Sequence, residues 1–121
     1  MMRLKNILIV VEDIDRSIQF YTELFGLYVV CRFEGNVILT EGLVLQERKN
    51  WEVLIEKKVE YSSCDSELFF VERDMDGFLK KLEESAFEIE FMNSITENSW
   101  GRRVVRLFDP DHHVIEVGED A

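Results

Sequence analysis

The chain has few of the residues that build metal centres and disulfide frameworks. Its 121 residues include two cysteines and two histidines. Cys31 and Cys64 lie far apart, in no metal-binding or redox spacing, so we read both as free thiols. His112 and His113 are adjacent, and neighbouring residues of a strand point to opposite faces, so they cannot chelate one ion together. The sequence therefore predicts neither a disulfide scaffold nor a histidine-cysteine metal site.

Basic residues are also scarce, at 14 against 25 acidic residues and a formal net charge of −11. Such a chain repels phosphate backbones and anionic lipid, so we expect no nucleic-acid or membrane partner. Its longest apolar runs, such as Ile7 to Val11, are too short to cross a bilayer. Met1-Met2-Arg3 leads into a strand rather than a signal sequence, and we expect a cytoplasmic protein.

The chain does contain an internal repeat, and at 46% hydrophobic it can bury an ordinary globular core. The segment from Asn6 to Asp15 matches the segment from Glu67 to Asp76 at an offset of 61. The apolar positions that follow coincide as well: Ile14, Ile18, Tyr21 and Phe25 map onto Met75, Leu79, Leu82 and Ala86. A strand that turns through Asp-x-Asp into an amphipathic helix is therefore used twice.

Periodicity and turn residues predict a β-α-β-β-β order in each half. The first half has strands at about Leu4 to Val11, Tyr28 to Phe33, Asn36 to Thr40 and Leu43 to Glu47, with helices at Asp15 to Phe25 and Asn50 to Lys57. The second half has strands at Glu67 to Glu72, Glu88 to Met92, Arg102 to Phe108 and His113 to Gly118, a helix at Asp76 to Ser85, and a polar loop at Asn93 to Ser99. We expect one α+β domain over residues 1–121, with modules at about 1–60 and 66–121. An offset of 70 aligns the last hairpins and pairs Gln46 with Glu116.

Two motifs resemble those of the vicinal oxygen chelate superfamily, which includes glyoxalase I, bleomycin-resistance proteins, fosfomycin-resistance proteins and extradiol dioxygenases. The first motif is Asp13, Asp15, Ser17, Phe20, Tyr21 and Gly26, and the second is Trp100, Gly101, Asp109, Pro110, Asp111, Val114, Ile115 and Glu116. The resemblance implies curved, cup-shaped mixed sheets and a homodimer. It does not specify function, because isomerases, thiol transferases, dioxygenases and non-catalytic binders share this scaffold.

The resemblance also implies where a divalent ion would bind, from residue types at matching positions. The first-strand positions are Asn6 and Glu67, and the last-strand positions are Gln46 and Glu116. These side chains offer only oxygen, which suits magnesium, calcium or manganese better than zinc or nickel. A metal-free pocket is the alternative, in which the two carboxylates hydrogen-bond to the amides or to an organic ligand.

In a metal-free pocket, Glu67 and Glu116 facing each other would favour keeping one carboxyl protonated, a condition for general acid-base catalysis. A metal-independent isomerase or epimerase would then need a cation to stabilise its enediolate intermediate. Arg102 and Arg106 share one face of their predicted strand and Arg103 takes the other, so Arg106 is a candidate. The alternative is that these arginines form ion pairs with nearby carboxylates.

Trp100 precedes Gly101 near the expected mouth of the second cup, where its ring can stack on a planar or cationic ligand. The alternative is that the ring is buried and anchors the Asn93 to Ser99 loop. His112 stands where the superfamily commonly has glycine, which indicates either a positive backbone dihedral or a different turn.

Two functions follow as hypotheses. The first is a small-molecule binding protein with an acidic, aromatic-lined cleft that traps a cationic or planar compound without turnover. The second is a divalent-metal-dependent lyase, isomerase or thiol transferase resembling glyoxalase I, with Glu116 as ligand or base. A bare interaction module is a third. Whether the protein is an enzyme stays open at this point.

Overall fold

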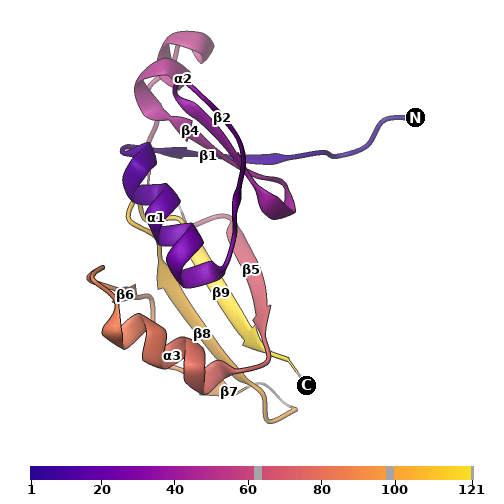
Figure 1. Ribbon diagram of the computed structural model, residues 1–121, viewed down its shortest axis with the longest axis vertical. Helices are drawn as coiled ribbons and strands as arrows, with labels where there is room; N and C mark the ends of the chain where they lie inside the picture. Colours follow the sequence, from indigo (N-terminus) through magenta and orange to yellow (C-terminus); the bar gives the residue numbers. More distant parts are fainter. Residues whose placement is uncertain (62–63, 98–99, 121) are drawn as a thin grey trace. The chain divides into compact units, whose positions relative to one another are not determined.

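A computed structural model of the chain describes residues 1–61, 64–97 and 100–120. The chain divides into two compact units, Met1–Glu60 and Tyr61–Ala121, and each contains one mixed sheet with its own helices (Figure 1). None of the helices in the described ranges is long and apolar enough to span a membrane.

The first unit is a four-stranded mixed sheet with the strand order β1-β4-β3-β2. Its elements are β1 (Ile7–Val11), α1 (Ile14–Phe25), β2 (Val29–Phe33), β3 (Asn36–Leu39), the 3-10 turn η1 (Thr40–Gly42), β4 (Leu43–Glu47) and α2 (Arg48–Ile55). β1 runs parallel to β4, and the remaining pairs are antiparallel. A parallel pair needs a crossover connection, and α1 with the β2–β3 hairpin supplies it.

The second unit repeats this arrangement, with the order β5-β9-β8-β6 and a short fifth strand, β7, paired to β8. Its elements are β5 (Glu67–Glu72), α3 (Met75–Glu84), β6 (Glu90–Phe91), β7 (Thr96–Glu97), β8 (Arg103–Phe108) and β9 (Val114–Glu119). β5 is parallel to β9, as β1 is to β4. The predicted α+β fold of tandem β-α-β-β-β modules is confirmed.

The repeated aspartate has the same structural role at the start of both helices. Asp13 caps α1 by accepting a hydrogen bond from the backbone N–H of Arg16, at 3.1 Å. Asp74, 61 residues later, caps α3 in the same way through the N–H of Gly77, at 2.9 Å. An aspartate in this position satisfies a backbone donor that has no partner within the helix. Both helices therefore begin one residue earlier than the sequence predicted.

Several predicted boundaries were too generous. The first strand begins at Ile7 rather than Leu4, because its partner strand starts at Leu43 and η1 turns the chain away before that residue. β6 begins at Glu90 rather than Glu88 because β8, its partner, ends at Phe108. The predicted loop from Asn93 to Ser99 contains β7, and its last two residues lie outside the described part of the chain.

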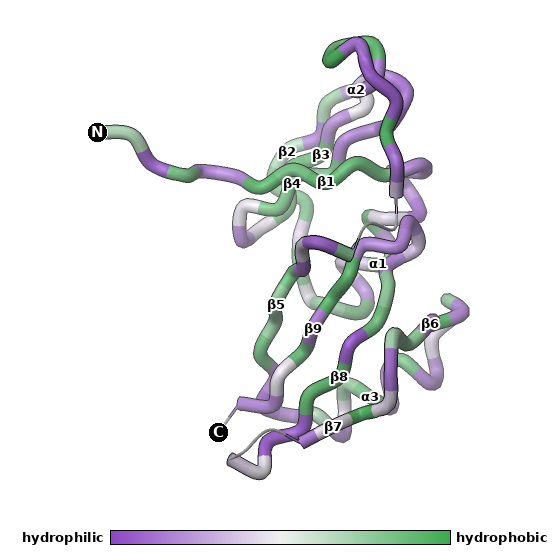
Figure 2. Tube along the Cα trace, turned by 180° about the vertical axis from the view of Figure 1, so that it is seen from behind, coloured by the Kyte–Doolittle hydropathy of each residue, from purple (hydrophilic) through white to green (hydrophobic). Residues whose placement is uncertain are grey.

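Each sheet buries one face. In the first unit the buried face carries Val11, Val37 and Leu45, and α1 packs against β4. In the second unit Val105 and Ile115 are fully buried, on the side of Leu107 and its partner Phe91. Phe91 lines a pocket with Leu79 of α3, so this is the side along which α3 lies. Hydrophobic residues accordingly run along the strands of both sheets (Figure 2).

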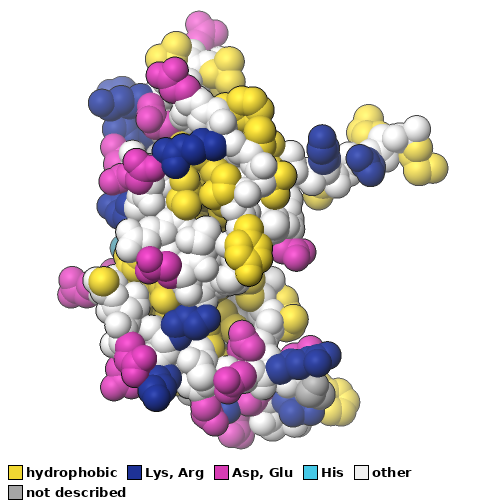
Figure 3. All heavy atoms as spheres, viewed as in Figure 1, with side chains coloured by type: hydrophobic (Ala, Val, Ile, Leu, Met, Phe, Trp, Pro, Cys, Tyr) yellow, Lys and Arg dark blue, Asp and Glu magenta, His cyan; other side chains and the backbone are white. Residues whose placement is uncertain are grey.

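The surface carries both signs of charge. On the face drawn in Figure 3, acidic and basic side chains are interspersed, and hydrophobic side chains are also exposed between them. On this face the charges are therefore not confined to one segment.

Candidate functional site

The face of the second sheet opposite α3 holds an aromatic ring, a carboxylate and a guanidinium in one row. Phe69 on β5 lies directly across from Glu116 on β9, and Glu116 lies directly across from Arg106 on β8. Residues paired in this way point to the same side of a sheet. We call this surface the open face; it comprises Glu67, Phe69, Val71, Arg106, Glu116 and Gly118.

The two charged groups of the row are paired with each other. Nε of Arg106 lies 2.8 Å from Oε1 of Glu116, and their side chains are 34% and 16% exposed. The arginine that sequence reasoning proposed as a separate cation thus already pairs with the proposed base. The ion pair that was the alternative for Arg106 is present, and its role as the cation of a binding site stays a prediction.

Phe69 projects from the open face as an exposed ring. It is 57% exposed, and Val71, two residues along on the same face, is 61% exposed. The ring edge lies over Gly118, with Cζ 3.1 Å from the position that a Cβ atom there would occupy. A side chain at this position would require the ring to shift by a few tenths of an ångström. The sequence analysis did not select Phe69; its place on the same strand face as Glu67 was the available signal.

Glu67 lies on the open face with Glu116, as the parity of the strand predicted. It is opposite Val114 on β9, and hence diagonal to Glu116, and its side chain is exposed. Long side chains in diagonal positions on neighbouring strands can still reach one another. Glu67 therefore contributes an exposed negative charge beside the Arg106–Glu116 pair.

In the first unit, Gln46 has internal partners. It is 8% exposed; its Oε1 accepts a hydrogen bond from Nδ2 of Asn36, at 2.8 Å, and its Nε2 donates to the carbonyl of Glu47, at 3.2 Å. Asn6 differs, because it is exposed and precedes β1. The two amides proposed as ligands thus have very different surroundings.

The strand register corrects the offset that paired Gln46 with Glu116. Glu47 lies opposite Val11 in the first sheet and Glu119 opposite Glu72 in the second, which is an offset of 72 rather than 70. Gln46 keeps the face that was predicted, because a shift of two residues preserves it. The two hairpins differ in the length of the connection between their strands. A single offset in sequence therefore could not align both strands of each hairpin.

The donor set does not fit a zinc or nickel centre. Among the described residues, no group of three or more histidine, cysteine, aspartate or glutamate side chains is placed to hold a metal ion. The oxygen of Gln46 accepts from Asn36, and Glu116 contacts a guanidinium that competes for its charge. Zinc and nickel favour nitrogen and sulfur ligands. We therefore derive no step through a metal.

The turn between β8 and β9 confirms the first interpretation of His112. Its φ is 67°, a left-handed conformation that glycine adopts most easily. The imidazole stacks on Phe108 with centroids 4.6 Å apart, and Nε2 lies 3.2 Å from Oε1 of Glu90. His113 instead contacts Asp109, at 2.7 Å between Nδ1 and Oδ2. The adjacent histidines have separate partners, so they do not form a chelating pair.

Trp100 is 84% exposed, so it does not anchor the neighbouring loop by burying its ring. No strand pairing places it on the open face, and its contribution to ligand binding stays a prediction. The end of the loop before it, residues 98–99, lies outside the described residues.

Arg103 takes the other face of β8, as predicted, and forms ion pairs there. Its Nη2 lies 2.8 Å from Oε2 of Glu119, and its Nη1 lies 2.6 Å from Oδ1 of Asp76. Hydrogen bonds from the guanidinium and backbone N–H of Arg103 lower the pKa of Glu119 from 4.5 to about 2. This cluster ties β8, β9 and the start of α3 together.

We expect Glu119→Gln to lower the thermal unfolding midpoint at pH 7 but to have little effect near pH 2. The folded protein holds Glu119 ionised while the unfolded chain takes up a proton, so its stabilising effect is present above about pH 4.5 and disappears as the pH falls towards 2. Circular dichroism melts of both proteins across this range measure the difference. Glu88→Gln, at an exposed carboxylate, is the control. An equal gap at pH 7 and pH 2 would contradict the assignment.

Comparison with known proteins identifies the family and the fold. A family model described as "Glyoxalase-like domain" matches residues 4–121. A crystal structure of a protein of unknown function from Agrobacterium tumefaciens is 31% identical, with a TM-score of 0.81 over 100% of this chain and 96% of that one. No curated protein sequence matches.

Two further structures share the fold at low identity. A glyoxalase-related enzyme from Fulvimarina pelagi is 19% identical, with a TM-score of 0.81 over 99% of this chain and 89% of that one. A glyoxalase/bleomycin resistance protein/dioxygenase family enzyme from Burkholderia phytofirmans is 17% identical, with a TM-score of 0.80 over 95% and 96%. The chain therefore belongs to the glyoxalase-like domain family, within the vicinal oxygen chelate superfamily that its two motifs resemble.

Proposed function

We propose that this protein binds a small, planar, positively charged organic molecule on the open face of its second sheet. The observation that carries the proposal is the exposed ring of Phe69 beside Glu67 and the Arg106–Glu116 pair. An exposed aromatic ring at a fixed position offers a stacking surface, and stacking on a planar ligand removes apolar area from water on both sides.

The charges on this face favour a cation. Arg106 neutralises Glu116, which leaves Glu67 as the unbalanced charge among the six residues that define the open face. A cation over Phe69 gains from the ring quadrupole and from the carboxylate of Glu67 together. The acidic balance of the whole chain also draws cations towards the surface.

Turnover has less support. A general base must be available to take a proton, whereas Glu116 contacts Arg106 and would have to exchange that partner for the substrate. The structural neighbours include a glyoxalase-related enzyme and a member of the glyoxalase/bleomycin resistance protein/dioxygenase family, so the scaffold alone does not decide. The proposal is therefore binding, with a homodimer as the expected assembly.

Fluorescence titration with proflavine, a planar cation, and with anilinonaphthalene sulfonate, a planar anion, tests the proposal. We expect proflavine to bind more tightly and to weaken as salt is added. Phe69→Ala should weaken proflavine about tenfold, since losing a stacked ring costs roughly 1–1.5 kcal/mol. Glu67→Gln should weaken it less, because the charge is exposed.

Tyr28→Ala and Glu88→Gln are matched controls, because both positions are exposed and neither belongs to the open face. Equal affinity for the two dyes, or equal effects of Phe69→Ala and Tyr28→Ala, would overturn the proposal. Elemental analysis of untagged protein addresses the alternative function. A stoichiometric divalent ion that is lost in Glu116→Gln would favour a metal-dependent lyase, isomerase or thiol transferase instead.

A further inference from the structure

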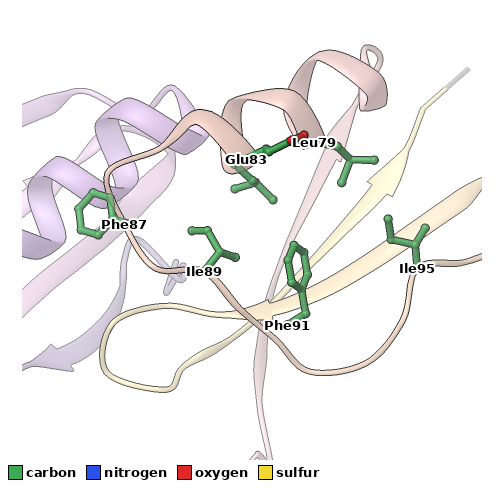
Figure 4. Close-up of a pocket in the computed structure, with 7 residues that line it drawn as sticks. Leu79, Glu83, Phe87, Ile89, Phe91 and Ile95 are labelled. Carbon is green, nitrogen blue, oxygen red and sulfur yellow. The ribbon is translucent and has the colours of Figure 1, made fainter.

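A pocket lies in the second unit, at the edge of the sheet where α3 and β6 meet. Its volume is about 430 Å³, within the range of sites that hold small ligands. Figure 4 shows side chains from α3 on one side and from the chain leading through β6 on the other. The lining includes Leu79, Glu83, Phe87, Ile89, Phe91 and Ile95.

This pocket is separate from the open face. Phe91 pairs with Leu107 on β8, and Leu107 is fully buried on the α3 side of the sheet. Arg106, one residue earlier, belongs to the opposite side. The sheet itself therefore stands between this pocket and the row formed by Phe69, Glu116 and Arg106.

The pocket is apolar but not sealed. Phe91 is 47% exposed and Ile95 is 45% exposed. Leaving two large apolar side chains half in water at one site costs free energy that a bound apolar group would recover. The exposure of Phe91 and Ile95 therefore indicates that these side chains do more than fill the hydrophobic core.

One charged side chain, Glu83, belongs to the lining of the pocket. Glu83 lies one helical turn after Leu79, so both line the same side of α3. The nearby Lys80 is directed to Glu84, with Nζ 4.0 Å from Oε1, and none of the ion pairs between described residues includes Glu83. Its carboxylate is available to a ligand at the rim of the apolar pocket.

We propose that this pocket binds an amphiphilic amine, with an apolar or aromatic body against Phe91 and Ile89 and a protonated amino group at the carboxylate of Glu83. The apolar lining and the single carboxylate together define that chemical class. An anion of the same shape would be repelled by the carboxylate of Glu83. It would also be repelled by the chain as a whole, whose net charge is −11. The site is independent of the function proposed for the open face.

Three probes of one shape and different charge test this proposal: 4-phenylbutylamine, 4-phenylbutanol and 4-phenylbutyrate. Isothermal titration calorimetry with the intact protein should give the tightest binding for the amine, then the alcohol, then the carboxylate. Amide chemical shifts in residues 79–83 and 87–91 should move on titration with the amine, and the shifts of Phe69 and Glu116 should stay in place.

Variants separate the body of the ligand from its charge. Phe91→Ala should weaken the amine and the alcohol alike, about tenfold. Glu83→Gln should weaken the amine about threefold and leave the alcohol unchanged, as for a solvent-exposed charge pair. Tyr28→Ala, at an exposed position outside both proposed sites, is the control and should affect neither probe. Binding of the amine that is unchanged in both Phe91→Ala and Glu83→Gln, or no saturable binding of any probe, would overturn the proposal.

Discussion

Replacing Asp109 by alanine is expected to lower the free energy of unfolding by about 3–5 kcal/mol. The carboxylate is fully buried, and its Oδ1 accepts hydrogen bonds from the backbone N–H groups of Asp111 and His113, at 2.9 and 2.8 Å. Its Oδ2 lies 2.7 Å from Nδ1 of His113. Alanine removes all three contacts and leaves two backbone donors without this acceptor, which costs more than the lost bonds alone.

Chemical denaturation of Asp109→Ala and Asp109→Asn measures this effect. Asparagine keeps an acceptor for the backbone donors but loses the charge that faces His113, so we expect an intermediate loss of stability. The double variant Asp109→Ala with His113→Ala should be less destabilised than the sum of the single variants, because the two side chains share a contact. Losses below about 1 kcal/mol for Asp109→Ala would show that the turn does not depend on this carboxylate.

Leu45→Ala is expected to cost about 2–5 kcal/mol, because it removes buried methyl groups and leaves a cavity. Leu45 is 0% exposed in the central strand β4 of the first sheet, between β1 and β3. Neither neighbouring strand can close the space without breaking its hydrogen-bonded ladder.

Leu54→Ala provides a matched control in the same unit. Leu54 lies in α2 and is 73% exposed, so the identical substitution should change the free energy of unfolding by less than about 0.5 kcal/mol. Urea unfolding followed by tryptophan fluorescence compares the two variants. Similar losses at both positions would contradict the placement of β4 at the centre of the sheet.

Local signals in the sequence were sufficient for the elements of the fold. Asp13 and Asp74 mark helix starts because an aspartate side chain caps the backbone donors that follow it. Gly26, with φ of 68°, ends α1 in the conformation that glycine adopts without strain. These interactions involve residues within a few positions of one another, so the sequence alone predicts them.

Strand ends were less predictable, because a strand extends only as far as its partner. β6 starts at Glu90 because β8 ends at Phe108, and the first strand starts late because β4 begins at Leu43. Neither partner is close in sequence to the strand that it limits. The corrected offset of the last hairpins has the same origin.

In the candidate site, too, some features were predictable from the sequence and others depended on strands that are distant in sequence. Alternation along a strand placed Arg106 and Glu116 on sheet faces, and the two motifs identified the family that the match over residues 4–121 shows. The sequence alone thus determined the repeat, the order of elements, the acidic character and the family. Only the tertiary structure decided that Glu116 pairs with Arg106, that Gln46 pairs with Asn36, and that Phe69 lies over Gly118. Such pairings depend on the register of strands that are distant in sequence, and register is fixed when the whole sheet forms its hydrogen bonds and buries one face.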